Sequence, residues 1–184
     1  MIVNEGFYLF IITAELLFLI SASVYIIFLI YSWLKGAPYV ATQKKSLDSI
    51  IQHARIKDGQ RIVELGSGDG RFLLEVAKKY KIIGLGVDIN PIPILKARIF
   101  ARMQKVSSVT FLLKDIRETD LTSADVIYIF LFPKLVQAIQ DNLLKNTKRN
   151  ALIISHGFKI EYLSKYHINT IKNGKFNTYF YKMK

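Results

Sequence analysis

The chain has 184 residues, 51% of them hydrophobic, and it contains no cysteine, which excludes disulfides and thiolate metal sites. Its three histidines lie far apart in the sequence without the spacing of metal ligands, so we predict no metal site. All 26 basic residues follow Leu34, together with all but two of the acidic residues. This net positive charge is compatible with binding to nucleic acid, with an anionic membrane surface, or with a lysine-rich face that is only solvated.

The N-terminal part is predicted to be a single transmembrane anchor. Phe7–Tyr31 is a run of 25 residues with one charge, Glu15, and as a helix it would extend about 37 Å, enough to cross a bilayer with some tilt. A cleaved signal peptide would need basic residues before a shorter apolar run, and a buried core helix would be shorter and one-sided. We therefore predict an anchor in residues 1–34 and one domain in residues 35–184.

The charges on either side of the anchor predict its orientation. No Lys or Arg precedes the apolar run, whereas Lys35, Lys44 and Lys45 follow it, so the C-terminal domain is expected in the cytoplasm. Glu15 lies near the middle of the span, where a charge costs about 2–3 kcal/mol. It could be protonated, reach outward, or contact a polar group of another membrane protein.

Predicted helices and strands alternate through the rest of the chain, and two alternating segments around Asn173-Gly174 predict a C-terminal hairpin with a type I′ turn. This order is typical of a Rossmann-like α/β fold with a mostly parallel sheet, which binds its ligand at the carboxyl ends of the strands. The predicted helices cover residues 44–56, 71–80, 92–104 and 133–145, and the predicted strands cover 61–65, 82–87, 109–113, 126–131 and 151–155.

The most informative segment is Arg61–Arg71, RIVELGSGDGR, in which a strand ends in a glycine turn that leads into a helix. The dinucleotide fingerprint G-x-G-x-x-G would need glycine at Arg71, and here the third glycine comes one residue early. Glu64 and Asp69 flank the turn with negative charge, which would suit a cationic ligand better than a pyrophosphate. S-adenosylmethionine is such a ligand, and the segment resembles motif I of class I methyltransferases.

A second carboxylate, Asp88, follows the next strand, 22 residues after Gly66. At this position of a βαβ unit a carboxylate can accept from the 2′ and 3′ hydroxyls of a ribose, and we expect Ile89 to contact the same ligand. Asp88 could also be a helix N-cap, a role that Pro91 and Pro93 support, and the two roles are compatible.

Three further segments narrow the resemblance: residues 37–42 (APYVAT), residues 114–116 (KDI) and residues 130–133 (FLFP). Together with ELGSGDGR they look like the membrane-anchored protein-lysine methyltransferases that act on the mitochondrial ATP synthase c-subunit and adenine nucleotide translocase, and their prokaryotic relatives. The resemblance covers nearly the whole chain. It implies a class I S-adenosylmethionine methyltransferase fold preceded by one transmembrane helix.

The resemblance also implies roles for individual residues. Asp115 would face the adenine amino group beside the backbone of Ile116, although Asp115 could instead only start a loop. Tyr39 and Thr42 would close over the cofactor near the methyl group, although Tyr39 could be an interfacial aromatic residue. The remaining cofactor contacts would come from Glu64, Gly66, Ser67, Gly68, Gly70, Asp88 and Ile89.

The acceptor side lacks the Asp/Asn-Pro-Pro-Tyr motif of amino- and base-methyltransferases and has FLFP in its place. Only backbone carbonyls there, such as that of Phe130, could orient an incoming amine, so we expect Tyr39 and Phe130 beside the reacting atoms. Lysine could lose its proton to solvent, because a partly apolar site lowers its pKa.

The expected function is S-adenosylmethionine-dependent methylation of a lysine. We expect this lysine in a membrane protein, because the anchor restricts the domain to targets near the bilayer. Two alternatives remain: methylation of a lipid or quinone head group, and a tethered cofactor-binding scaffold without catalysis. RNA methylation rests only on the positive charge, since no aromatic-interleaved basic platform or helix-turn-helix pattern supports nucleic acid.

Overall fold

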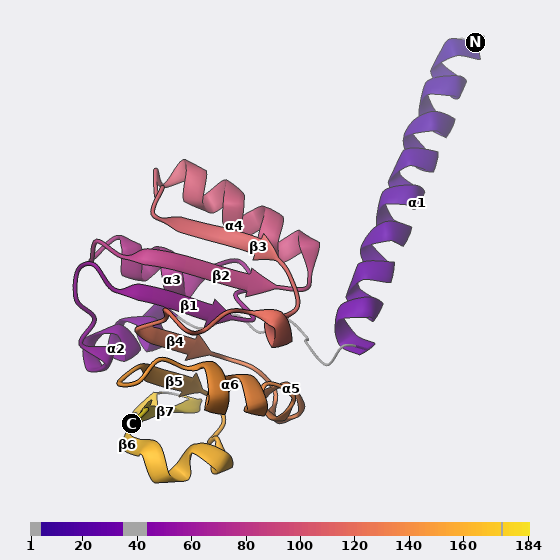
Figure 1. Ribbon diagram of the computed structural model, residues 1–184. Coiled ribbons are helices and arrows are strands. Elements are labelled where there is room, and N and C mark those ends of the chain that lie inside the picture. The colour runs from indigo at the N-terminus through magenta and orange to yellow at the C-terminus, as the bar shows by residue number, and fades with distance from the viewer. Residues whose placement is uncertain (1–4, 35–43, 174) are drawn as a thin grey trace. The chain divides into compact units, whose positions relative to one another are not determined.

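The computed structural model describes residues 5–34, 44–173 and 175–184, which form two separate units (Figure 1). The first is the single helix α1, Glu5–Leu34, and the second is a domain that contains every element from α2 to β7. The positions of the two units relative to one another are not determined, and each is described by itself.

Helix α1 is the one helix of the described residues that is long and apolar enough to cross a membrane, as judged by length and composition. Along Glu5–Ile27 its apolar residues are not buried within this unit. The Oγ atoms of Thr13 and Ser23 donate to backbone carbonyls one turn earlier, at 2.8 Å in each case. The helix therefore satisfies these polar groups internally, as an apolar environment requires.

The domain is built on one seven-stranded sheet with the strand order β3-β2-β1-β4-β5-β7-β6. The first five strands are parallel, and β7 lies antiparallel between β5 and β6. The predicted fold, a Rossmann-like parallel sheet with a C-terminal antiparallel hairpin, is thus confirmed. The strands are β1 Arg61–Leu65, β2 Ile83–Asp88, β3 Val109–Leu113, β4 Val126–Ile129, β5 Leu152–His156, β6 His167–Asn173 and β7 Phe176–Lys182.

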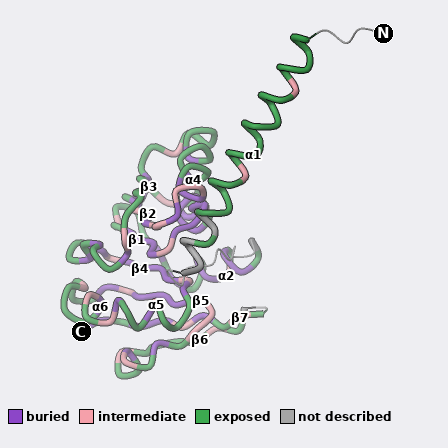
Figure 2. Tube along the Cα trace, turned by 90° about the vertical axis from the view of Figure 1, so that its right-hand side faces the viewer, coloured by how far each residue is buried: buried purple, intermediate pink, exposed green. Residues whose placement is uncertain are grey.

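Helices cover both faces of the sheet and bury a separate hydrophobic cluster on each (Figure 2). One cluster packs α2, α3 and α4 against the sheet and includes Phe72 stacked on Tyr128, with ring centroids 3.9 Å apart. The other packs α5, α6 and two 3-10 helices against the opposite face. The helices are α2 Lys44–Ala54, α3 Arg71–Ala77, α4 Pro91–Met103, α5 Pro133–Ala138 and α6 Gln140–Asn146, and the 3-10 helices are η1 Ile116–Glu118 and η2 Glu161–Tyr166.

Some predicted boundaries are wrong. The helix expected over residues 71–80 ends at Ala77, and the helix expected over 133–145 is interrupted at Ile139, whose φ of −101° and ψ of 8° leave the helical range. The interruption separates α5 from α6 while Val136, Ile139 and Leu143 all stay buried in the core. The predicted hairpin is present as β6 and β7, but Gly174 of its turn lies outside the described residues.

Candidate functional site

The candidate site lies at the edge of the sheet where the parallel strands end (Figure 1). The chain passes from β1 to β2 on one side and places β4 on the other side of β1, so the strand order reverses at β1. Ligands of doubly wound sheets bind at the carboxyl ends of the strands beside such a reversal. Glu64, Asp88, Phe130 and His156 lie at or directly after the ends of four of these strands.

The glycine turn after β1 has the left-handed backbone that the sequence predicts. Gly66, Gly68 and Gly70 have φ angles of +74°, +53° and +76°, a region that side chains disfavour. A Cβ on Gly66 would lie 2.4 Å from Cδ2 of Leu131, so the segment after β4 packs directly on the turn. The backbone N–H of Gly66 donates to the Val87 carbonyl at 2.8 Å, which ties the turn to β2.

Glu64, the last residue but one of β1, is a buried carboxyl group two positions before this turn. Its Oε2 accepts from the Leu73 N–H at 3.4 Å, and only 5% of the residue is exposed. Burial raises the pKa of Glu64 well above its usual range, and the negative charges of Asp69 and Asp88 raise that pKa further. A positive charge bound nearby would favour the ionised form and offset this cost.

Asp88 holds the end of β2 against the glycine turn. Its Oδ2 accepts from the Gly68 N–H at 2.9 Å, and its Oδ1 accepts from the Asn90 N–H at 2.8 Å. Burial raises the pKa of this carboxyl group. The N-cap interpretation of Asp88 is wrong: Asn90 caps α4 by accepting from the Ile92 N–H at 3.1 Å, because Asp88 lies two residues too early. Ile89, between them, is half-buried.

Asp115 lies on the neighbouring strand end. The Lys114 N–H donates to the Asp88 carbonyl at 3.0 Å, so the residues after β3 come close to those after β2. Asp115 caps η1 by accepting from the Arg117 N–H at 2.9 Å, and it also forms an ion pair with the Arg117 guanidinium. The loop-starting role is therefore real, and the buried Ile116 follows it.

Ser67, in the glycine turn, provides the sharpest sign of a ligand. The residue is 5% exposed, and among the described residues its Oγ has no hydrogen-bond partner. An unpaired buried hydroxyl is costly, and a bound polar molecule would satisfy it. Together with two carboxyl groups and a turn that contains three glycines, this hydroxyl fits a cationic, hydroxyl-bearing ligand such as S-adenosylmethionine.

A group of three rings occupies the adjacent strand ends. The Phe130 ring lies 4.6 Å from the His156 ring and 5.5 Å from the Phe176 ring, measured between centroids. Gly157, with a φ of +94°, allows this approach, since a Cβ there would come within 3.0 Å of Phe130 Cε2. The sequence predicts Phe130 in the site but not His156 or Phe176, whose only signal is their place at predicted strand ends.

His156 is neutral in this setting. Only 2% of the residue is exposed, and its Nδ1 lies 2.8 Å from Thr178 Oγ1. Burial lowers the pKa of His156 to about 4, because the charged imidazolium loses its hydration there. The partly exposed rings of Phe130 and Phe176 therefore form an aromatic surface beside an uncharged imidazole, and this surface can accept a cationic or amine-bearing side chain.

Two predicted site residues, Tyr39 and Thr42, lie outside the described residues. Every other predicted site residue lies in the glycine turn, at a strand end, or in the segment that directly follows a strand. The structure brings the Glu64, Asp88 and Asp115 segments to one edge of the sheet and connects them through hydrogen bonds and packing.

Comparison with known proteins agrees with this geometry. Residues 64–167 match the family described as the ANTKMT methyltransferase domain. A protein-lysine N-methyltransferase of Saccharolobus islandicus (strain REY15A) is 26% identical over 148 residues, covering 79% of this chain and 92% of that protein. The adenine nucleotide translocase lysine N-methyltransferase of Mus musculus is 28% identical over 124 residues, covering 67% of this chain and 54% of that protein.

The lysine N-methyltransferase of Homo sapiens that is named for the ATP synthase c-subunit is 24% identical over 132 residues, covering 71% of this chain and 56% of that protein. The chain therefore spans about half the length of the mouse and human relatives. Among solved structures, an RNA methyltransferase from Salinibacter ruber in complex with S-adenosyl-L-homocysteine superimposes with a TM-score of 0.73 at 26% identity. The match covers 78% of this chain and 94% of that one.

Proposed function

The chain belongs to the ANTKMT methyltransferase domain family, and from this membership we propose that it is a membrane-tethered protein-lysine N-methyltransferase. It is a methyltransferase, and its cofactor is S-adenosylmethionine. The observation that carries the proposal is the glycine turn with its unpaired Ser67 hydroxyl and buried Glu64, in a chain whose similar relatives are named as protein-lysine methyltransferases.

The residues at the strand ends divide the cofactor between them. Glu64 and the turn Gly66–Gly70 would hold the methionine part of the cofactor, where the carboxylate would complement its positive charge and the Ser67 hydroxyl would gain a hydrogen-bond partner. Asp88 accepts from the ribose hydroxyls, since its carboxylate has lone pairs beyond those used by Gly68 and Asn90. Asp115 and Ile116 would lie beside the adenine, together with Ile89.

The acceptor amine enters on the Phe130 side. When bound, the cofactor supplies a sulfonium methyl group that a neutral amine nitrogen can take by in-line displacement. The Phe130 carbonyl accepts an N–H of the incoming lysine and so aims its lone pair, while the rings of Phe130, His156 and Phe176 exclude water. The neutral state of His156 avoids repulsion of the lysine, whose proton leaves to solvent.

Helix α1 tethers the enzyme to the membrane and so concentrates it near lysines of membrane proteins. We place the domain in the cytoplasm, because no Lys or Arg precedes the apolar run and all 26 follow it. Protease added to intact cells should leave the domain intact, and a reporter fused after Lys184 should register as cytoplasmic. External digestion of the domain would contradict this orientation.

The decisive experiment identifies the methyl acceptor. Membranes are incubated with the full chain and tritiated S-adenosylmethionine, and the label is traced to protein, lipid or RNA. We expect label on protein that hydrolyses to methyl-lysine. Label in lipid or quinone, or in RNA, would replace the proposed substrate, and a protein that binds cofactor but labels nothing would be a scaffold.

The proposed closing role of Tyr39 has its own test. In a protein shortened to begin at Lys35, Tyr39→Ala should slow methylation of a soluble lysine peptide while leaving the fold unchanged. Tyr39→Phe, which keeps the ring, should retain more activity if ring packing over the cofactor is what matters. If Tyr39 is only an interfacial aromatic residue, neither variant will differ from the parent protein.

A further inference from the structure

The solvent-facing side of α4 is apolar, the reverse of what a surface helix normally shows. The side that faces the sheet is buried through Ile94, Ala97 and Ala101. The opposite side carries three large apolar residues at helical spacing, and they are Leu95, Ile99 and Met103, with exposed fractions of 59%, 47% and 73%.

Further apolar residues are exposed on α4 and at the end of β3, the edge strand of the sheet. Phe100 on the helix is 38% exposed, and Leu112 and Leu113 at the end of the strand are 40% and 53% exposed. A groove between α4 and β3 is lined by Leu112 together with Arg98 and Arg102. We call the exposed apolar side of α4, formed by Leu95, Ile99 and Met103, together with the adjoining groove residues Arg98, Arg102, Lys105 and Leu112, the α4 face.

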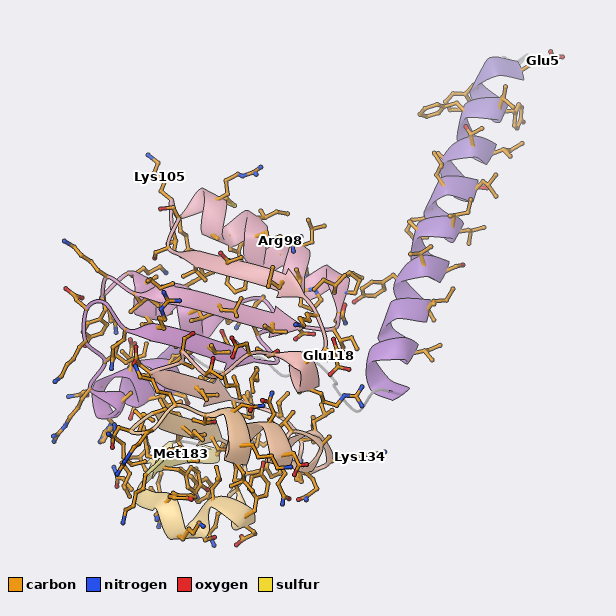
Figure 3. The ribbon with its side chains drawn as sticks, in the orientation of Figure 1. Glu5, Arg98, Lys105, Glu118, Lys134 and Met183 are labelled. Atoms are coloured by element: carbon orange, nitrogen blue, oxygen red, sulfur yellow. The ribbon has the colours of Figure 1, made fainter. Side chains whose placement is uncertain are left out.

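The charged residues in the sequence that forms α4 and β3 are all basic. The sequence from Ile89 to Lys114 contains five basic residues and no acidic one, and they are Lys96, Arg98, Arg102, Lys105 and Lys114. Figure 3 shows Arg98 on α4 and Lys105 in the turn that follows it. The Arg98 guanidinium donates to the Phe111 carbonyl at 2.8 and 3.0 Å. Within the described part of the chain, no carboxylate forms an ion pair with Arg102 or Lys105.

We propose that the α4 face rests on an anionic lipid bilayer. Large apolar side chains flanked only by basic ones match the boundary between acyl chains and anionic head groups. Nine residues separate Leu34 from Lys44, so the chain between the two helices reaches about 35 Å at most. The domain therefore stays close to any bilayer that α1 crosses. The inference extends the proposed tethering, and its test does not depend on methyl transfer.

Contact through the α4 face would also place the candidate site beside the bilayer. Helix α4 begins shortly after Asp88, with Asn90 as its N-cap, so its first turn lies at the edge of the sheet that carries the site. An enzyme held in this way would meet lysines that project just above the head groups.

The test uses a protein that begins at Lys35, because α1 would otherwise dominate membrane binding. This part should fold by itself, since both hydrophobic clusters consist of residues from Leu47 onward. Sedimentation with vesicles is compared for phosphatidylserine mixed with phosphatidylcholine and for phosphatidylcholine alone. We expect binding to the anionic vesicles that weakens with added salt, and little binding to the neutral ones.

Variants locate the contact on the protein. Ile99→Glu and Met103→Glu should each lower partitioning to anionic vesicles about tenfold or more, which corresponds to about 1.4 kcal/mol. Ile168→Glu is the matched control, because Ile168 is 59% exposed but lies on β6, at the opposite edge of the sheet. The contribution of positive charge is tested with Arg102→Glu. Its matched control is Arg149→Glu, because Arg149 lies before β5 and outside the α4 face.

The proposal is overturned if the α4 variants bind like the parent protein, or if the control variants lose as much binding. It is also overturned if Ile99→Glu dissociates a lipid-free dimer, because a second copy would then cover this face. The rate at which a soluble lysine peptide is methylated should be unchanged in all of these variants. This measurement distinguishes a failure of the membrane-contact proposal from a failure of the proposed enzymatic function.

Discussion

In the free protein, burial makes ionisation of Glu64 and Asp88, the two carboxyl groups next to the glycine turn, unfavourable. Burial raises the pKa of both Glu64 and Asp88, and the negative charge of Asp88 adds to the effect on Glu64. A positively charged ligand removes this cost, because it favours the ionised carboxylates. Charge complementarity therefore contributes to affinity in addition to hydrogen bonding.

Binding of S-adenosylmethionine should release protons from Glu64 at pH values where this carboxyl group is still protonated in the free protein. The raised pKa of Glu64 in the free protein falls when the cationic cofactor binds, so the binding enthalpy should depend on the ionisation enthalpy of the buffer. Glu64→Gln, which has a similar shape without the charge, should bind more weakly and lose the buffer dependence. Calorimetry in two buffers makes the measurement, and an unchanged buffer dependence in the variant would exclude Glu64 as the source.

Asp88→Ala should weaken cofactor binding by roughly 1–3 kcal/mol, because ribose hydroxyls would lose their acceptor. Asp120→Ala is the control, since Asp120 is an exposed carboxylate that accepts from Thr122 after η1. Calorimetry on folded proteins measures both variants. Equal affinity of Asp88→Ala and the parent protein would remove Asp88 from the site, and tight NADH binding by the parent would contradict the cofactor assignment.

His156 should make the domain less stable in weak acid. Its pKa is about 4 in the folded protein against about 6.5 in an unfolded chain. Between these values the unfolded chain binds the proton more readily, so this contribution is complete above pH 6.5 and is lost as the pH falls toward 4. His156→Gln should not show this loss. Denaturant unfolding across this pH range measures the free energy of unfolding of the parent protein and of the variant. The acid-induced decrease should be larger in the parent protein by roughly 2 kcal/mol.

The turn that joins β1 to α3 depends on close packing as well as on backbone conformation. Gly70 precedes α3 with a φ of +76°, and a Cβ there would lie 2.3 Å from the buried Phe111 ring. Gly59 has a similar φ of +81°, but a Cβ there would meet nothing within 4 Å. Comparing Gly70 with Gly59 therefore separates the requirement for a left-handed backbone from the requirement for close packing.

Gly59→Ala should cost about 1–2 kcal/mol for its left-handed backbone alone. Gly70→Ala should lose a further 1–3 kcal/mol, roughly, because Phe111 cannot move without disturbing the core. Unfolding in urea measures both variants. Equal losses would mean that the Phe111 ring moves aside easily and that close packing is unimportant at this turn.

At the scale of the whole molecule, the two units should have separable roles. Every residue that we assign to the cofactor and methyl transfer follows Leu34, and the domain has its own core. A protein that begins at Lys35 should therefore bind S-adenosylmethionine with about the same affinity as the full chain. It should label a membrane substrate much less well, because α1 no longer concentrates it at the bilayer.

Cofactor calorimetry and labelling of membranes test this separation, with methylation of a soluble lysine peptide as the control. A shortened protein that labels membranes as well as the full chain would show that α1 has no part in target choice. A shortened protein that no longer binds cofactor would show that α1 supports the fold.

Local features of the sequence determined the first helix, the order of strands and helices, and the glycine turn between Glu64 and Arg71. These follow from hydrophobic periodicity and from the backbone freedom of glycine, which act between residues close together in the chain. The carboxylates Asp88 and Asp115 could be placed at one edge because parallel strands end on the same side.

Only the tertiary structure decided which distant residues meet. Leu131 covers Gly66, and Phe130 meets His156 and Phe176, because β4 lies between β1 and β5, an order that no local pattern encodes. The tertiary structure also decided which side of α4 is buried, because the sequence of this helix is apolar on two sides. Packing against the sheet buries one side, and the other is left facing outward among basic residues.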